Sequence, residues 1–329
     1  MRLSAKIKVA LAITVGLVVT TAVDANAAPS FQRYVALGDS YTAGPLIPWQ
    51  QASWCFRSNN NYPSWLATHL GLYSKPGGFT DVSCSSADTT NMTQSQTTPS
   101  TDIPLTSQPP QFEALRLDTD LITIGIGGND FSVFGSLIST CPEVRSSDPA
   151  GHPCQDHYTI NGIDTVKAAI KQTQLNLENV IKGARTRSPA AKIVIVGYPR
   201  LVPPSGYCPD VVPFADGDYA WTDSVARALN DAQATAARRQ NATFVDAYAA
   251  SLGHDACTGS AAWVSGQSTN LFRAVAYHPY QQGMEGVANL VYRALGGRTP
   301  ATVAPLARDA ATKAQLEQMA DIVPKTLNH

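Results

Sequence analysis

One stretch decides the fold of this chain: Tyr34-Val35-Ala36-Leu37-Gly38-Asp39-Ser40-Tyr41-Thr42-Ala43-Gly44. A short apolar run of β-forming residues ends in Gly38-Asp39-Ser40. This pattern predicts a strand that carries Ser40 to the carboxyl edge of a sheet, where open α/β folds place their chemistry. A serine there can act as a nucleophile if a base and oxyanion donors meet it. Gly38-Asp39-Ser40 alone is also an ordinary turn sequence, so the choice between a catalytic serine and a simple turn depends on the rest of the chain.

Length and composition narrow the possible classes. The 329 residues suffice for one large α/β domain or two small ones. Charged residues make up only 15% of the chain, which favours an exported protein over a highly charged cytosolic one. The formal net charge of −1 gives no reason to expect binding to nucleic acid or to an anionic membrane.

The N-terminus has the three parts of a secretory signal peptide. Basic residues occur within the first eight positions, residues 9–19 are apolar, and Ala25-Asn26-Ala27 is a small-x-small cleavage site. The apolar run is shorter than the roughly 20 residues of a membrane-spanning helix. We therefore expect residues 1–27 to be removed and the mature protein to be secreted, with no membrane span.

The cysteines form an even set, which an oxidising compartment would pair as disulfides. Many connectivities are possible for six cysteines, and the sequence does not choose among them. Sequential pairing is the simplest hypothesis: Cys55–Cys84, Cys141–Cys154 and Cys208–Cys257. Residues 141–157 also contain the residue types of a zinc site, but their spacing fits no standard zinc pattern. We therefore expect neither a metal nor a cofactor.

Short apolar runs alternate with helical periods along the chain. The predicted strands are Arg33–Leu37, Phe79–Ser83, Asp120–Ile126, Lys192–Gly197 and Thr243–Asp246. The predicted helices are Tyr62–Leu72, a short one within 109–117, Ile163–Arg187, Asp218–Asn241 and Tyr280–Leu295. This order predicts one open, mostly parallel α/β sheet within a domain of residues 28–298. Residues 131–161 are expected to be irregular, and residues 299–329 to form a C-terminal helical extension.

Four chemically suggestive segments lie at or beyond the ends of predicted strands: Gly38-Asp39-Ser40, Cys84-Ser85-Ser86, Gly127-Gly128-Asn129-Asp130 and His278. Because the carboxyl ends of parallel strands share one edge, these segments can converge. Ser40 would be the nucleophile and His278 its general base. The backbone N–H groups of Ser40 and Ser86 and the side-chain amide of Asn129 would stabilise the oxyanion. Each segment alone has a simpler interpretation as a turn or a helix start.

These residues resemble the GDSL lipase/esterase family, also called SGNH hydrolases. The match lies in 38–44, in 127–130 and in His278-Pro279, and the resemblance spans about residues 33–297. Within this family, the chain is most similar to secreted actinobacterial members, which have three disulfides between cysteines that are neighbours in the sequence. The resemblance implies a flavodoxin-like three-layer α/β/α sandwich with five strands, and ester hydrolysis through an acyl-enzyme on Ser40.

Two positions depart from the family pattern. Where the second block usually offers a glycine as oxyanion donor, this chain has Ser86, whose backbone N–H can still donate. The family also has an aspartate three residues before the histidine, where this chain has Val275. A backbone carbonyl can orient the imidazole instead, and we favour that of Ala276. The alternatives are Val275, Asp246 and Asp255.

The residues predict a monomeric, secreted serine ester hydrolase that acts on a small or lipid ester. A catalytically idle binding module on the same fold is an alternative, because the acid and the glycine are missing. A carbohydrate acetyl esterase is another alternative. Acyl-chain length depends on the pocket, which we expect the loops 45–61, 89–110 and 201–217 to line.

Overall fold

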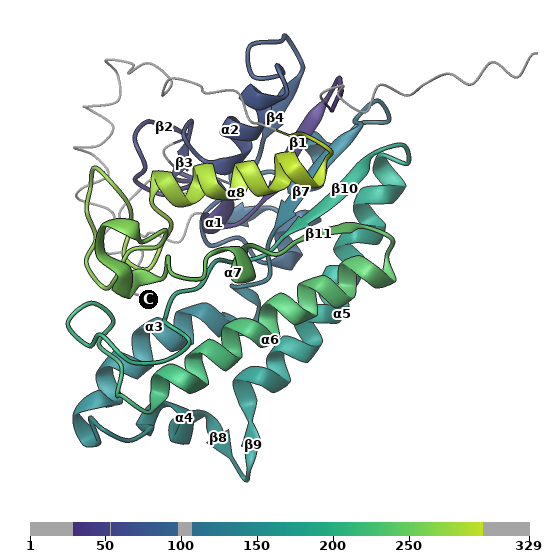
Figure 1. Cartoon of the computed structure of the whole chain (residues 1–329). Coiled ribbons are helices and arrows are strands. Elements are labelled where there is room, and N and C mark those ends of the chain that lie inside the picture. Colours follow the sequence, from purple (N-terminus) through teal and green to yellow (C-terminus); the bar gives the residue numbers. More distant parts are fainter. Residues whose placement is uncertain (1–28, 53, 98–106, 299–329) are drawn as a thin grey trace, which may run out of the picture.

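The computed structural model describes residues 29–52, 54–97 and 107–298, and its centre is a parallel sheet (Figure 1). The strands are β1 (Tyr34–Gly38), β4 (Phe79–Asp81), β7 (Leu121–Gly125), β10 (Lys192–Val196) and β11 (Thr243–Val245). Their spatial order is β11-β10-β7-β1-β4, and every neighbouring pair is parallel. The first strand therefore lies between the second and the third, which is the flavodoxin-like order. The prediction of five strands is confirmed, with bounds that differ by at most two residues.

Helices cover both faces of the sheet, because alternate strand residues are apolar on both sides (Figure 1). Tyr34 and Ala36 pack with α2 (Tyr62–His69) and α8 (Gln281–Ala294). Val35 and Leu37 pack in a second core with α5 (Thr165–Arg187) and α6 (Asp218–Arg239). The result is the predicted three-layer α/β/α sandwich.

The start of α5 shows how a local sequence sets an element's boundary. The helix was expected from Ile163, but Ile163–Asp164 forms β9, which pairs with β8 (Thr159–Ile160). Asp164 then caps the helix, because its carboxylate accepts the backbone N–H of Lys167 at 2.9 Å. The helix therefore begins two residues later than its apolar period suggests.

The expectation of an irregular segment at 131–161 is wrong. This segment contains α3 (Val133–Val144) and α4 (Pro153–Tyr158). Val133, Leu137 and Cys141 are buried at four-residue spacing, which is a helical period. The period is easily missed because Pro142 lies inside the helix and Phe131 and Ser132, just before it, adopt left-handed φ.

The remaining elements are short. The helices are α1 (Ser40–Ala43) and α7 (Ala247–Ala250), with 3-10 turns at Thr89–Met92, Gln111–Ala114, Asp130–Ser132, Arg145–Ser147 and Ala256–Ala261. Two further strand pairs are antiparallel: β2 (Gln50–Ala52) with β3 (Arg57–Ser58), and β5 (Gln96–Thr97) with β6 (Ser107–Gln108). The predicted short helix within 109–117 is therefore a 3-10 turn.

The three disulfides join Cys55 to Cys84, Cys141 to Cys154 and Cys208 to Cys257. Because Cys141 and Cys154 are bonded to each other, they are not thiolate ligands for zinc. Across the described ranges, no helix combines the length and apolarity needed to cross a membrane. The predicted signal peptide (1–27) and C-terminal extension (299–329) lie outside the described residues.

Candidate active site

Ser40 lies at the carboxyl edge of the sheet because β1 ends one residue before the cap of α1. Gly38, the last residue of β1, packs so closely that a Cβ atom there would lie 2.1 Å from Thr42 Oγ1 and 2.5 Å from the Gly125 carbonyl oxygen. Asp39 caps α1, because its carboxylate accepts the Tyr41 backbone N–H at 2.9 Å. Ser40 is therefore the first helical residue, and it is 6% exposed.

His278 forms a buried pair with Ser40. The His278 Nε2 atom lies 2.8 Å from Ser40 Oγ, and His278 Nδ1 lies 2.7 Å from the Ala276 carbonyl oxygen. A carbonyl oxygen can only accept, so Nδ1 must carry the ring proton in the neutral imidazole. Nε2 is then unprotonated and accepts the hydrogen bond of the Ser40 hydroxyl, as a general base requires.

The other groups considered for orienting the His278 ring have different partners. The Val275 carbonyl accepts the Ser265 hydroxyl at 2.7 Å and the His278 backbone N–H at 3.1 Å, so both of its lone pairs are used. Asp246 accepts the Ala249 backbone N–H at 2.8 Å and caps α7, and Asp255 likewise accepts the Cys257 N–H at 3.0 Å. The structure thus places the Ala276 carbonyl, and no carboxylate among the described residues, against His278 Nδ1.

Two side chains hold the loop that carries His278. The Ser265 hydroxyl accepts the His278 backbone N–H at 3.1 Å, and the Ser265 N–H donates to the His278 carbonyl at 2.9 Å. The Tyr41 hydroxyl donates to the Tyr277 carbonyl, and the Tyr41 ring centroid lies 5.3 Å from that of His278. The residue next to Ser40 therefore also fixes the backbone beside His278.

Burial lowers the pKa of His278 to about 4, and the hydrogen bond to the Ala276 carbonyl opposes this shift. The imidazole is therefore neutral at neutral pH. A neutral imidazole can accept the serine proton, whereas an imidazolium cannot.

We expect kcat/KM to stay level as the pH falls through 6.5, and to fall only as it approaches about 4, because His278 protonates there. The pH profile of kcat/KM on a neutral ester measures this. Asp39→Asn is the control, since burial raises the pKa of this neighbouring carboxyl to about 7. The acid limb should persist in that variant, and an acid limb centred near 6.5 in the wild type would contradict the assignment.

The three predicted oxyanion donors differ in how the structure presents them. The backbone N–H groups of Ser40 and Ser86 have no acceptor within the described part of the chain. Asn129 Nδ2 donates to the Ala87 carbonyl at 2.9 Å, which leaves its second N–H available. Ser40 and Asn129 line the same cavity, and Ser86 does not. The hydrogen bond from Asn129 to the Ala87 carbonyl connects Asn129 to the turn that contains Ser86.

Ser86 has a backbone conformation that is ordinarily adopted by glycine. Its φ is +66°, in the left-handed region that favours glycine. A serine in this conformation carries an energetic cost of roughly 1–2 kcal/mol.

We expect Ser86→Gly to stabilise the protein slightly. The change removes the cost of the left-handed conformation, and the greater flexibility of glycine in the unfolded chain offsets only about 0.5–1 kcal/mol of that gain. The expected rise in the melting temperature is about 2–4 °C per kcal/mol gained. Thermal unfolding followed by circular dichroism measures it. Ser86→Ala is the matched control and should show no rise, so an equal rise in both variants would contradict the strain at Ser86.

Tyr198 is a site residue that the sequence analysis missed. Its hydroxyl donates to Asp39 and accepts the Gly128 backbone N–H at 2.9 Å. It therefore joins the segment of Ser40 to the segment of Asn129. Tyr198 comes two residues after the end of β10, at the same sheet edge as the other site residues, so the rule that singled out Ser40 also applies to it.

An apolar cavity opens beside Ser40. Helix α3, the segment after β10 and helix α6 line it with Val133, Phe134, Leu137, Pro199, Leu201, Val225, Ala226 and Leu229. Among the described residues of the three loops expected to line the pocket, only Leu201 of 201–217 lines this cavity. Helix α3, which the sequence did not predict, supplies Val133, Phe134 and Leu137. The described ranges hold no cluster of three His, Cys, Asp or Glu side chains that could bind a metal.

The fold and the site define the class: a hydrolase on a three-layer α/β/α sandwich, with a serine and a histidine paired at the sheet edge. The chain belongs to the GDSL-like Lipase/Acylhydrolase family, which matches residues 36–285. The resemblance noted in the sequence is thereby confirmed, and the protein is an ester hydrolase.

Individual relatives agree with this assignment. Lipase 2 of Streptomyces coelicolor is 36% identical over 241 residues, covering 72% of this chain and 76% of its own. Phospholipase A1 from Streptomyces albidoflavus superposes with a TM-score of 0.63 at 27% identity, covering 82% of this chain and 99% of that one. An extracellular lipase from Streptomyces rimosus gives a TM-score of 0.62 at 27% identity, covering 80% and 99%.

Proposed function

We propose that this protein is a secreted hydrolase of lipid esters, with Ser40 as nucleophile and His278 as general base. The observation that carries the proposal is the buried 2.8 Å contact between Ser40 Oγ and His278 Nε2, with His278 Nδ1 on the Ala276 carbonyl. No cofactor takes part. The three disulfides support export, because such bonds persist in oxidising compartments.

The proposed reaction has two halves. Ser40 Oγ attacks the ester carbonyl carbon while its proton passes to His278 Nε2, and the carbonyl oxygen becomes an oxyanion. The tetrahedral intermediate collapses, the C–O bond to the alcohol breaks, and the leaving alcohol takes the proton from Nε2. Water then attacks the acyl-enzyme by the same route, releases the acid and restores the Ser40 hydroxyl.

The carbonyl of Ala276 takes the place of the usual acid. When Nε2 gains a proton, the imidazolium keeps its Nδ1–H bond to this carbonyl, which holds the ring in position. A neutral carbonyl stabilises the imidazolium less than a carboxylate does. Burial lowers the pKa of His278 more than the Ala276 carbonyl raises it, and the low pKa lets the protonated ring return its proton readily to the leaving alcohol.

The cavity beside Ser40 supports an acyl chain longer than acetyl. Its side chains are mostly apolar, and an acyl chain gains roughly 0.8 kcal/mol for each CH₂ that it buries. An acetyl group would leave this surface unused. The printed names of the relatives, lipase and phospholipase A1, point the same way.

The test is hydrolysis of p-nitrophenyl esters from acetate to palmitate, with phospholipid vesicles and acetylated xylan beside them. We expect kcat/KM to rise from acetate to a medium or long chain, and acetylated xylan to be a poor substrate. A maximum at acetate with good activity on xylan would favour a carbohydrate acetyl esterase.

Narrowing the cavity should shift this preference. Ala226 lines the cavity from α6, and Ala226→Phe places a ring where an acyl chain would lie. We expect kcat/KM on p-nitrophenyl decanoate and longer esters to fall by about 10-fold or more, because the burial of roughly two CH₂ groups is lost. The kcat/KM on the acetate ester should change little. The exposed Ala220→Phe on the same helix is the matched control. Parallel losses on both esters would contradict an acyl site in this cavity.

A further inference from the structure

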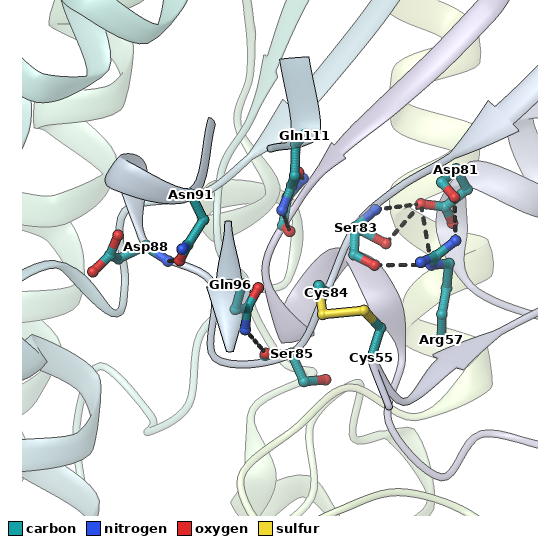
Figure 2. Close-up of a disulfide and its surroundings, with 11 residues drawn as sticks. Cys55, Arg57, Asp81, Ser83, Cys84, Ser85, Asp88, Asn91, Gln96 and Gln111 are labelled. Atoms are coloured by element: carbon teal, nitrogen blue, oxygen red, sulfur yellow. Dashed lines mark hydrogen bonds and ion pairs between the residues drawn. A yellow bond between two sulfur atoms is a disulfide. The ribbon is translucent and has the colours of Figure 1, made fainter. Parts of the chain in front are cut away.

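The turn that carries Ser86 is held on several sides (Figure 2). The Cys84 N–H donates to the Gly38 carbonyl at 3.0 Å, and the Ser85 N–H donates to the Cys55 carbonyl at 3.0 Å. Cys55 and Cys84 are joined by a disulfide directly beside the turn. These contacts fix where the chain enters the turn, but they do not fix the orientation of the peptide group between Ser85 and Ser86.

That peptide is the middle one of a β-turn. The Ala87 N–H donates to the Cys84 carbonyl at 3.1 Å, so Ser85 and Ser86 are the two central residues. Only Ser86 of the two has a positive φ, which is the pattern of a type II turn. A type II turn favours glycine or asparagine at this position, because its φ is positive there, whereas a type I turn accepts most residues, serine included. The two types differ by a flip of the middle peptide, which reverses its N–H and its carbonyl.

Gln96 of β5 makes the contact that distinguishes the two orientations. Its Nε2 donates to the Ser85 carbonyl oxygen at 2.7 Å, as the dashed line in Figure 2 shows. The side chain is 9% exposed, so little water is at hand to replace this donor. In a trans peptide the carbonyl and the following N–H point in opposite directions. The bond to the Ser85 carbonyl therefore directs the Ser86 N–H away from Gln96.

We propose that Gln96 is a positioning residue for the oxyanion hole, which holds the Ser85–Ser86 peptide in the orientation that presents the Ser86 N–H. This inference rests on the proposed function. A flipped peptide would withdraw the donor and turn the Ser85 carbonyl oxygen toward the developing negative charge. The serine at position 86 makes the flip more accessible than glycine would, and the Gln96 amide compensates.

The test is a double-mutant cycle on purified protein. Gln96→Met keeps the length of the side chain and removes the donor. We expect kcat to fall by about 10- to 100-fold, below the full loss of an oxyanion donor, with KM within about twofold. In the Ser86→Gly background, where glycine favours the type II turn by itself, Gln96→Met should cost about threefold or less.

Gln108 provides the matched control, because it lies directly opposite Gln96 in the hairpin and makes no hydrogen bond to the Ser85 carbonyl. Gln108→Met should leave kcat unchanged. A merely structural role for Gln96 would lower kcat equally in both backgrounds, and that result, or wild-type kcat in Gln96→Met, would overturn the proposal.

A second variant covers the case in which Gln96→Met does not fold. Gln96→Glu presents a carboxylate that accepts and does not donate, so it favours the flipped peptide. When the carboxyl is protonated it can donate again. We expect kcat relative to wild type to recover as the pH falls from 7 to 5, and a constant ratio would contradict the proposal. If the wild type is inactive, or Ser40→Ala is fully active, the proposed function fails instead.

Discussion

Ser40→Ala is expected to lower kcat on p-nitrophenyl esters by about 10⁴- to 10⁶-fold while KM changes little. In the proposed mechanism the Ser40 hydroxyl oxygen forms the acyl-enzyme, and this Oγ atom lies 2.8 Å from His278 Nε2. Without it, only the oxyanion donors and substrate binding remain, which give a small residual rate. Steady-state kinetics on the purified variant measure the loss.

The exposed Ser139→Ala on α3 is the matched control for this result and should keep the wild-type kcat. The melting temperature of Ser40→Ala should stay close to that of the wild type, because the change removes one hydroxyl and no apolar packing. Full activity in a folded Ser40→Ala protein would show that another group is the nucleophile.

His278→Ala is expected to lower kcat by a similar factor, about 10⁴- to 10⁶-fold, because the Ser40 hydroxyl then has no base. His254→Ala is a well-matched control. His254 Nδ1 also faces a backbone carbonyl, that of Ala261 at 2.7 Å, but this histidine lies outside the site. It should keep a kcat within a few-fold of the wild type, whereas an equal loss in both histidine variants would point to a folding defect.

The double variant Ser40→Ala/His278→Ala separates a catalytic pair from two independent contributors. Residues that act as one unit are strongly non-additive, so the double variant should be about as slow as either single variant. Additive losses would contradict a shared proton transfer between Ser40 and His278.

Much of the fold follows from periodicity alone. The run at 120–126 is nearly continuous in apolar residues, and it forms the central strand β7 with helices on both faces. The helix α3 was missed because Pro142 and the two left-handed residues before Val133 resemble loop sequence. Tertiary packing of Val133, Leu137 and Cys141 overrides those local signals.

The candidate site was predictable where residues follow strand ends, as Ser40 and Asn129 do. Gln96 was not predictable, because its contact with Ser85 depends on where the β5–β6 strand pair lies relative to the turn. Tyr198 fulfilled the strand-end rule but was overlooked, since a tyrosine there carries no motif. Sequence motifs therefore predict the candidate reacting groups better than they predict the residues that position those groups.

The two departures from the family pattern have different structural meanings. Val275 stands where the family has an aspartate, and the contact with His278 Nδ1 is made instead by the Ala276 carbonyl, a backbone group that no side-chain change at 275 removes. Ser86 keeps the backbone conformation of a glycine, with φ of +66°. In the proposed mechanism both substitutions change side chains where the chemistry uses the backbone, so neither argues for an idle site.

Covalent labelling with a fluorophosphonate, followed by peptide mass mapping, tests the proposed mechanism most directly. Such a probe reacts with a serine that a base activates, and its tetrahedral phosphorus places an oxygen in the oxyanion hole. We predict one phosphonylated serine in the wild type, Ser40, with loss of esterase activity in proportion to labelling and no label in His278→Ala. An unlabelled wild-type protein that is folded, or a label on a different serine, would contradict the assignment of Ser40 and His278 as the catalytic pair.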